Sequence, residues 1–182
     1  ERLGIAADTA EARIDLASLL AAMGSVSAGL GQLLIAERLV ESASLGPSLL
    51  ADATLVGADL RALINDYEGA AADYDRASDL YRASNNLPGQ AGADGGRGFM
   101  ELNRENWPVA VDRLSRAREE FNSAGHLRPR AIAGLYLAFA LNQSGDVDAA
   151  RTVLRESMQE AEALDDPVMS AALLGMQADI ES

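Results

Sequence analysis

Few side chains in this sequence belong to the types that carry out catalysis. The chain has one histidine, His126, and no cysteine. A general base acts beside a nucleophile and an orienting acid, and the surrounding residues 123–129 include no acid. We therefore expect no catalytic residue and no enzymatic activity. We expect His126 to interact with the dipole at the C-terminal end of a helix.

A glycine-rich segment at residues 89–98 is a candidate for a phosphate-binding loop. A phosphate-binding loop ends in Gly-Lys-Ser/Thr or follows a strand, and neither feature accompanies these glycines. The repeat of the sequence instead places them inside a helix, where each glycine costs about 1 kcal/mol relative to alanine. The segment is predicted to be either a weak helix or a flexible hinge.

Adjacent carboxylates are common in the chain, for example at residues 119–120 and 165–166. They lack the ligand spacing of a calcium loop, and the absence of cysteine excludes thiolate sites. We interpret them as solvated helix faces. No metal and no cofactor is expected.

The charge of the chain limits the classes of partner. Acidic residues outnumber basic ones by 28 to 15, the formal net charge is −13, and every basic residue counted is arginine. Such a chain repels phosphate backbones, so we expect no direct binding of nucleic acid, whereas a basic protein or peptide would be attracted. No apolar run is long enough to cross a membrane, and no signal peptide opens the chain. We expect no membrane partner and a cytoplasmic location.

The sequence is organised by a repeat, visible as columns of matching residues 40 or 41 positions apart. Small residues recur where two helices must approach closely, and large apolar residues recur where a helix begins. Within each repeat the members fall on one face of a helix. The columns are Ala17, Ala58, Gly98, Ala138 and Ala178; Val26, Tyr67, Trp107 and Val147; Gly29, Ala70, Ala110 and Ala150; Leu33, Tyr74, Leu114 and Leu154; and Ala36, Ala77, Ala117 and Ser157.

Capping residues and prolines mark the predicted helix ends. Residues that cap helix N-termini precede the column of large residues, and Pro108 suits a first helical turn. Other prolines are expected between repeats, because proline disrupts a helix interior. The caps are Ser25, Asp66, Asn106 and Asp146, and the prolines between repeats are Pro47, Pro88, Pro129 and Pro167.

These boundaries predict one repeat domain over residues 1–182, expected to be a fragment of a longer chain. The repeats lie near 10–47, 51–88, 91–129 and 131–167, with a partial repeat at 168–182. The helix pairs are 10–23 with 26–44, 50–64 with 67–84, 91–104 with 107–124, and 130–143 with 147–164. Residues 1–7 are expected to be the tail of a preceding helix.

The columns resemble the tetratricopeptide repeat, most closely at residues 65–77 and next at 143–150. That motif has a small residue late in its first helix, an apolar or aromatic residue opening its second, and two small residues within the second. HEAT-type repeats have a similar period but match the small-residue columns less well. The resemblance implies an all-α fold, a right-handed α-solenoid of antiparallel helix hairpins forming a tetratricopeptide-like superhelix.

Two departures from that motif stand out. The unit has 40 residues rather than the standard 34, and we expect the extra length in the second helix and the linker. The bulky residue expected early in the first helix is replaced by Arg13, Thr54, Asp94 and Gly134.

The family resemblance also implies where a partner would bind, because the first helices of such repeats line a concave face. Phe99 and Phe139 are 40 residues apart and should share one face of adjacent repeats. They are either exposed anchors of a peptide groove or packed against neighbouring helices. The predicted partner-binding residues are Phe99, Leu102, Asn103, Leu135, Phe139, Asn142 and Gln143.

The function predicted from these observations is a non-enzymatic scaffold module that binds a protein or a peptide. The alternative is a regulatory or sensor domain of a larger bacterial signalling protein, such as a transcriptional regulator or a repeat-linked protease. Clamping of chaperone C-terminal tails is not expected, because the family's clamp requires lysine and the chain has none.

Overall fold

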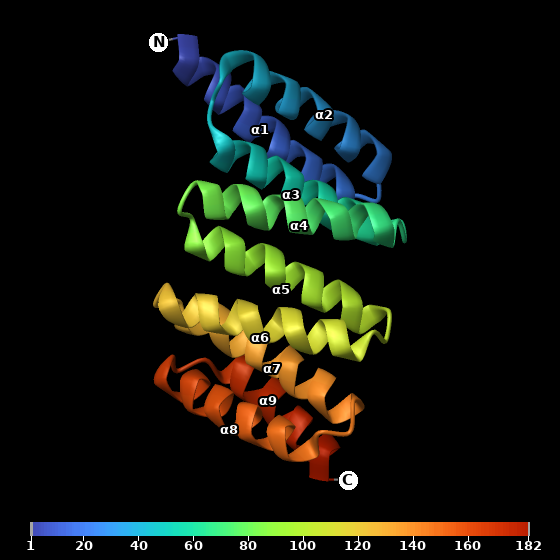
Figure 1. Ribbon diagram of the computed structural model, residues 1–182, viewed down its shortest axis with the longest axis vertical. Coiled ribbons are helices and arrows are strands. Elements are labelled where there is room, and N and C mark those ends of the chain that lie inside the picture. Colours follow the sequence, from blue (N-terminus) through green and yellow to red (C-terminus); the bar gives the residue numbers. More distant parts are fainter. Residues whose placement is uncertain (1, 182) are drawn as a thin grey trace. The chain divides into compact units, whose positions relative to one another are not determined.

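The computed structural model describes residues 2–181, and these form nine helices joined by three-residue turns (Figure 1). No β-strand occurs among the described residues. Consecutive helices pack as antiparallel neighbours, so the predicted all-α, α-solenoid class is confirmed. The helices are α1 (Arg2–Ala22), α2 (Val26–Ala43), α3 (Pro47–Leu63), α4 (Tyr67–Ala83), α5 (Leu87–Asn103), α6 (Trp107–Ser123), α7 (Leu127–Gln143), α8 (Val147–Ala163) and α9 (Pro167–Glu181).

Four prolines lie inside helices, and their predicted position between repeats is wrong. Pro47 and Pro167 are the first residues of α3 and α9, while Pro88 and Pro129 lie in the first turns of α5 and α7. The first amides of a helix have no partner within it, so a proline there removes no hydrogen bond. Therefore α3, α5 and α7 begin three or four residues earlier than predicted from the sequence, and α9 begins one residue earlier.

The repeat is divided evenly between its two helices. From α3 to α8 every helix has 17 residues, and every turn has the same length. The expected long linker is therefore absent, and the extra length is shared by both helices. Residues 2–7 belong to α1 and are not the tail of a separate helix, because no proline or glycine pair interrupts the chain after them. Glu1 lies outside the described residues.

The predicted capping residues all occupy N-cap positions, but only two of them cap through their side chains. Asp66 accepts a hydrogen bond from the Gly69 amide at 3.1 Å, and Asp146 accepts one from the Ala149 amide at 3.2 Å. Ser25 and Asn106 make no such bond.

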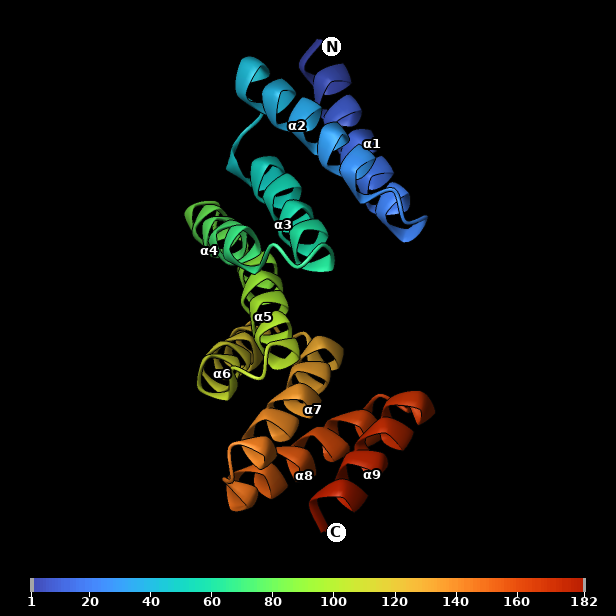
Figure 2. The ribbon, with the colours of Figure 1, turned by 90° about the vertical axis from the view of Figure 1, so that its right-hand side faces the viewer.

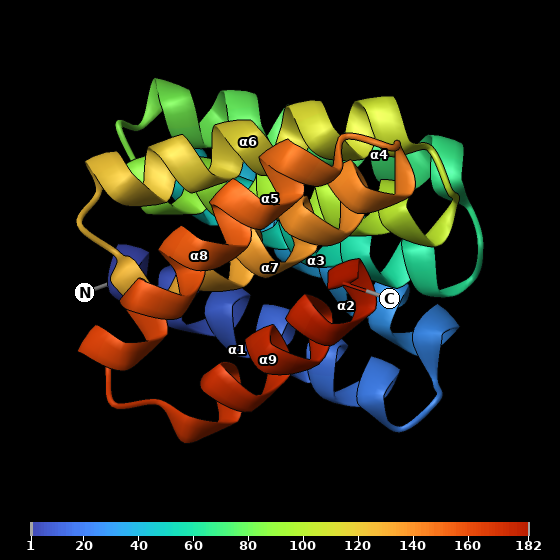
Figure 3. The ribbon, with the colours of Figure 1, turned by 90° about the horizontal axis from the view of Figure 1, so that it is seen from below.

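Backbone contacts divide the chain into two compact units, Glu1–Ala93 and Asp94–Ser182. In the first unit α1 and α2 lie side by side and both contact α3, which pairs with α4 (Figure 2). In the second unit α7 packs against α6 and α8, and α9 lies beside α7 and α8 (Figure 3). Each core includes small and large residues of the predicted columns. Ala17, Ala58, Ala70, Ala110, Ala138 and Ala150 are all 0% exposed.

Glycines in these columns sit where helices touch most closely. A Cβ atom at Gly98 of α5 would lie 2.6 Å from Leu114 Cγ and 3.2 Å from the Leu114 nitrogen on α6. A Cβ atom at Gly29 of α2 would lie 2.8 Å from the carbonyl oxygen of Ala17 on α1. Both contacts are too short for a side chain, so glycine allows these helix pairs to approach.

Polar contacts explain why bulky residues are missing early in the first helices. Asp94 is fully buried, and its carboxylate pairs with Arg113 at 2.7 Å and Arg116 at 3.2 Å, both on α6. At Gly134 of α7, any side chain would meet the hydroxyl of Ser157 on α8. At these two positions the facing helix therefore presents polar side chains.

Candidate peptide-binding groove

A groove of about 590 Å³ lies in the second unit, on the first helices of its hairpins. That volume is within the range of about 300–1,000 Å³ typical of ligand sites. The wall residues come from α5, α7 and α9, and from the turn and start of α6. They are Phe99, Leu102, Asn103, Glu105, Trp107, Leu135, Tyr136, Phe139, Ala172, Gly175, Met176 and Asp179.

Five of the seven residues predicted to bind a partner line this groove: Phe99, Leu102, Asn103, Leu135 and Phe139. The other two, Asn142 and Gln143, lie on the last turn of α7 and are not part of the lining. Gln143 is exposed and Asn142 is half-buried. The structure thus brings most of the predicted set together, and a role in binding stays a prediction for all seven.

Seven groove residues were not predicted from the sequence: Glu105, Trp107, Tyr136 and the four on α9. The repeat could have predicted two of the groove residues on α9. Asp179 follows Phe139 by 40 residues, and Gly175 follows Leu135 by the same distance. Because the repeat places equivalent positions on one face, both belong to the lining of the next hairpin.

Two aromatic pairs shape the walls of the groove. The Phe99 and Tyr136 rings lie 5.0 Å apart between centroids, tilted by 58°, and the Trp107 and Phe139 rings lie 6.0 Å apart in an edge-to-face arrangement. Such pairs stabilise by about 0.5–1.5 kcal/mol beyond their burial. Phe99 nevertheless remains 44% exposed. Each ring therefore packs on a neighbouring hairpin, as one of the two interpretations predicts, and also lines the groove. A role as peptide anchors stays a prediction.

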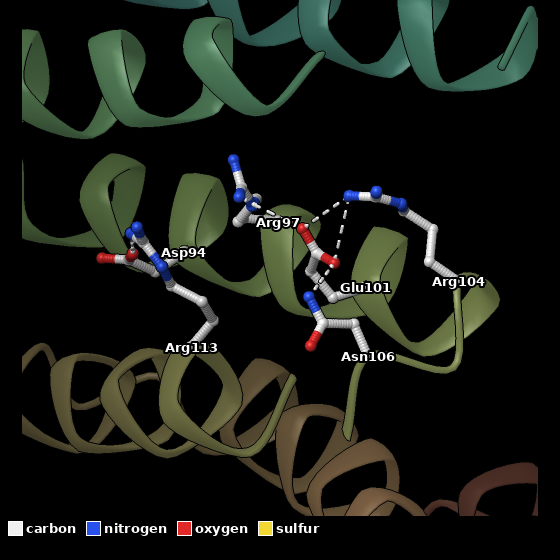
Figure 4. A network of polar contacts seen from close by, with 6 residues as sticks. All are labelled: Asp94, Arg97, Glu101, Arg104, Asn106 and Arg113. Atoms are coloured by element: carbon white, nitrogen blue, oxygen red, sulfur yellow. Dashed lines mark hydrogen bonds and ion pairs between the residues drawn. The ribbon is translucent and has the colours of Figure 1, made fainter. Parts of the chain in front are cut away.

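A buried carboxylate holds the turn that leads to Trp107 (Figure 4). The Glu101 side chain is 1% exposed and pairs with Arg97 at 3.1 Å and Arg104 at 3.3 Å. Its Oε2 atom also accepts a hydrogen bond of 2.9 Å from the amide of Asn106. The Asn106 side chain therefore links the turn to α5 and forms no capping hydrogen bond to α6.

This turn places Glu105 at the groove in an uncommon backbone conformation. Glu105 has φ 58°, in the left-handed region. The same turn position is occupied by Gly125, Gly145 and Asp165 in later turns and by Asn65 and Asn85 in earlier ones. Glycine and asparagine adopt this region readily, whereas other residues pay about 1–2 kcal/mol. The Glu105 side chain is exposed, and no arginine forms an ion pair with it in the described part of the chain.

The electrostatics of the groove follow from its lining. Two carboxylates, Glu105 and Asp179, are present, and no arginine or histidine contributes. An aromatic groove edged by carboxylates has a negative potential that attracts cationic groups.

His126 and the acidic side chains are the remaining candidates for chemistry. His126 is the exposed N-cap residue of α7, and its backbone amide donates to the Phe121 carbonyl at 2.9 Å, so it also lies at the C-terminal end of α6. An interaction of its side chain with the helix dipole stays a prediction. The turn before α7 is short enough that the next helix begins at once. No three His, Cys, Asp or Glu side chains in this range are grouped to hold a metal ion. None of the helices described here has the length and apolar character needed to cross a membrane.

The fold is therefore an α-solenoid of helix hairpins, and its second unit carries an aromatic, acidic groove. A crystal structure of BtubC (BKLC) from P. vanneervenii is similar to this chain, with a TM-score of 0.63 and 15% sequence identity over 100% of this chain and 86% of that one. Identity at this level supports the fold alone. No family model matches the chain, and no curated protein matches it. Membership of the tetratricopeptide repeat family stays a prediction.

Proposed function

We propose that the second unit is a polypeptide-binding module and that its groove is the binding site. The observation that carries this proposal is the gathering of four aromatic side chains in one groove on successive hairpins. A few desolvated aromatic side chains usually supply most of the affinity of a protein interface. The proposal includes no catalytic step.

The chemistry of the lining favours a polypeptide over a compact polar ligand. Apolar surface from Leu135 and Met176 adjoins the rings and suits the side chains of an extended or helical segment. The exposed amide of Asn103 both donates and accepts hydrogen bonds, which suits the polar groups of a peptide backbone.

The preformed shape of the groove also supports binding. The aromatic pairs and the Glu101 network hold the lining in place without a ligand, so little side-chain entropy is lost on association. Fully burying an exposed phenylalanine contributes about 1.5–3 kcal/mol. Phe99 is therefore the side chain whose removal should weaken binding most clearly.

The experiment is a selection from a displayed library of random dodecapeptides on the immobilised chain. Peptides that bind the native chain should be lost on a Phe99→Ala variant and retained on Phe121→Ala, because Phe121 lies on α6 outside the groove. Recovery of no peptide, or of peptides that bind Phe99→Ala equally well, would contradict the proposed function.

A further inference from the structure

We infer that the first unit has a ligand site of its own, a pocket walled by α2, α3 and α4 that takes a cation carried on a short apolar chain, of the alkylguanidinium or alkylammonium class. The pocket has a volume of about 290 Å³, and all of its lining residues belong to the first unit. The inference therefore does not depend on the function proposed for the second unit. Three observations carry it: the missing side chain at Gly57, the leucine wall on α2 and the carboxylate of Glu37.

The pocket exists because a glycine stands where later repeats have a long side chain. Gly57 of α3 contributes to the lining, and the equivalent residues of α5 and α7, at intervals of 40, are Arg97 and Leu137. The Arg97 side chain is 14% exposed and Leu137 is buried, so long side chains fill this position in both later helices. The first unit has no side chain of its own there, and the space is open to a group from outside.

The neighbours of Gly57 do not require glycine. A Cβ atom at Gly57 would lie 3.7 Å from Leu33 Cδ1 and 3.7 Å from Asp73 Oδ2, which are ordinary contact distances. Glycine weakens a helix interior, and close packing of α3 against its neighbours does not explain its presence here. A leucine lies on one side of this position and a carboxylate on the other, which suits a group with an apolar part and a cationic part.

The wall on α2 is apolar. Leu30, Leu33 and Leu34 line the pocket, and Leu34 remains 49% exposed. The Thr54 hydroxyl on α3 already donates to the Leu50 carbonyl at 2.7 Å, so it has no hydrogen left to donate to a ligand. Because a polar group without a hydrogen-bond partner is costly to bury, this part of the pocket favours an alkyl chain.

Glu37 places a carboxylate beside this wall without a partner for it. It follows Leu33 by four residues and Leu34 by three, so the three side chains share one face of α2, and all of them line the pocket. Among residues 2–181 Glu37 forms no ion pair and no hydrogen bond. Burial raises the pKa of Glu37 despite the nearby charges of Arg76 and Arg61. A cation bound in the pocket would supply the missing partner.

The one arginine of the lining has partners already. Arg61 contacts Asp66 at 3.0 Å and Asp73 at 2.7 Å. The lining thus contains three carboxylates, those of Glu37, Asp66 and Asp73, and a single cation. The excess of negative charge favours a cationic ligand over an anionic one.

A guanidinium or ammonium group on a short chain matches this arrangement. Its alkyl stem can cover Leu33 and Leu34 while its charged head reaches Glu37, in the way that arginine and lysine side chains cover apolar surface and keep their charge at the rim. A guanidinium also presents paired N–H donors to a carboxylate. A free amine or guanidine and a basic side chain of a partner polypeptide share this chemistry.

The test follows backbone amide chemical shifts of the isotope-labelled chain during titration with butylguanidinium and with butylurea, its neutral counterpart. Butylguanidinium should shift the amide of Gly57 and its neighbours saturably, and butylurea should bind at least about tenfold more weakly, because hydrogen bonds to a charged group are the stronger kind. A third probe, arginine blocked at both ends, separates the sources. Tighter binding than butylguanidinium assigns the site to a side chain of a partner, and weaker binding assigns it to a free compound.

Two variants with matched controls locate the site. Glu37→Gln should weaken butylguanidinium about tenfold, whereas Glu41→Gln, which removes the same charge one turn along α2 and outside the lining, should not. Gly57→Ala should weaken it at least about threefold, because the added methyl group occupies part of the pocket. Gly31→Ala is its control, since Gly31 is exposed on α2 and a Cβ atom there meets nothing within 4 Å.

The outcomes bear on this pocket alone. Shifts that do not saturate, or that are spread over the chain without a maximum near Gly57, overturn the inference. Equal affinities for butylguanidinium and butylurea overturn the claim of a cation site, as does an unchanged affinity in Glu37→Gln. Neither result affects peptide binding in the second unit, which is tested separately through Phe99→Ala.

Discussion

The ring of Phe99 on α5 lies 5.0 Å from the ring of Tyr136 on α7, measured between centroids. This contact joins two successive hairpins at the wall of the groove, although Phe99 remains 44% exposed. The same side chain therefore contributes to packing and presents apolar surface. Phe139 occupies the equivalent place on α7 and also contacts a neighbouring hairpin, where its ring packs edge-to-face against Trp107 at the start of α6.

Two glycines of α5 should respond in opposite ways to replacement by alanine. A Cβ atom at Gly98 would clash with Leu114, whereas a Cβ atom at Gly92 meets nothing within 4 Å. Gly98→Ala should destabilise the protein by about 1–3 kcal/mol through overpacking, and Gly92→Ala should stabilise it by about 0.4–1 kcal/mol. Urea unfolding of both variants measures the difference. Equal shifts in the same direction would show that α5 and α6 do not approach as described.

The glycine-rich segment should open more readily than the corresponding part of α7. Residues 89–98 form an uninterrupted part of α5, but interior glycines lower helix stability by about 1 kcal/mol each. Amide hydrogen exchange should therefore be faster at residues 89–98 than at residues 131–141. Gly92→Ala should slow the exchange of its neighbours. Equal protection of the two segments would contradict the predicted weakness.

The columns of the repeat show what the sequence could predict. Small residues such as Ala110 and Ala150 mark close helix contacts wherever they occur at helical spacing, and both are fully buried. The prolines led to wrong predictions of where the helices begin, because Pro88 and Pro129 are equally compatible with a linker and with a first helical turn. Only the three-dimensional arrangement distinguishes these alternatives.

The groove was predictable in part. Phe99 and Phe139 were found from their register alone, and Asp179 shares that register. The contribution of Glu105 depends on the conformation of a turn that glutamate rarely adopts. The orientation of the Asn106 side chain depends on the buried Glu101 carboxylate. Asn106 donates a hydrogen bond to this carboxylate and does not cap the amides of α6. Neither effect has a local sequence signature.

Two aspartates that contact Arg61 should give stability opposite dependences on pH. Burial raises the pKa of Asp73, despite its 2.7 Å ion pair with Arg61. The hydrogen bond from the Gly69 amide, followed by that from Arg61, lowers the pKa of Asp66. The pKa of Asp73 is higher in the folded than in the unfolded protein, where it is about 3.9. The contribution of this group to stability is therefore fully present below about pH 3.9 and is lost as the pH rises through the pKa of the folded state. The pKa of Asp66 is lower in the folded than in the unfolded protein. Its contribution to stability is therefore present above the unfolded pKa and is lost as the pH falls through the pKa of the folded state.

Replacing each aspartate by asparagine tests whether the two groups have opposite effects on stability. Asp73→Asn should raise stability at neutral pH, by less than about 1 kcal/mol for a partly exposed group, and the gain should vanish near the unfolded pKa. Asp66→Asn should lower stability at neutral pH, with the loss disappearing in acid. Urea midpoints measured across the pH range give both curves. The same sign for both variants at neutral pH would contradict the described contacts of Arg61.

Loss of the Glu101 carboxylate should destabilise the second unit and disturb the groove. Glu101→Leu leaves Arg97 and Arg104 without their buried partner, and breaking such a pair costs about 3–5 kcal/mol. The exposed pair of Asp148 and Arg151 supplies the control, since Asp148→Asn should change stability by less than about 1 kcal/mol. Glu101→Leu should also shift the emission of Trp107, because the turn before Trp107 loses its anchor at Asn106. Similar stabilities for the two variants would show that the network is not structural.

The central claim is that the groove of the second unit binds a polypeptide. Trp107 is the single tryptophan of the chain and lines the groove, so its fluorescence reports directly on occupancy. The decisive measurement is a titration of the selected, unlabelled peptide against the native chain, Phe99→Ala and Phe121→Ala. We predict a saturable change in Trp107 emission, an affinity at least about tenfold weaker for Phe99→Ala, equivalent to about 1.4 kcal/mol, and an unchanged affinity for Phe121→Ala. A peptide that binds without altering Trp107 emission, and with the same affinity for all three proteins, would contradict the claim and place the binding site elsewhere.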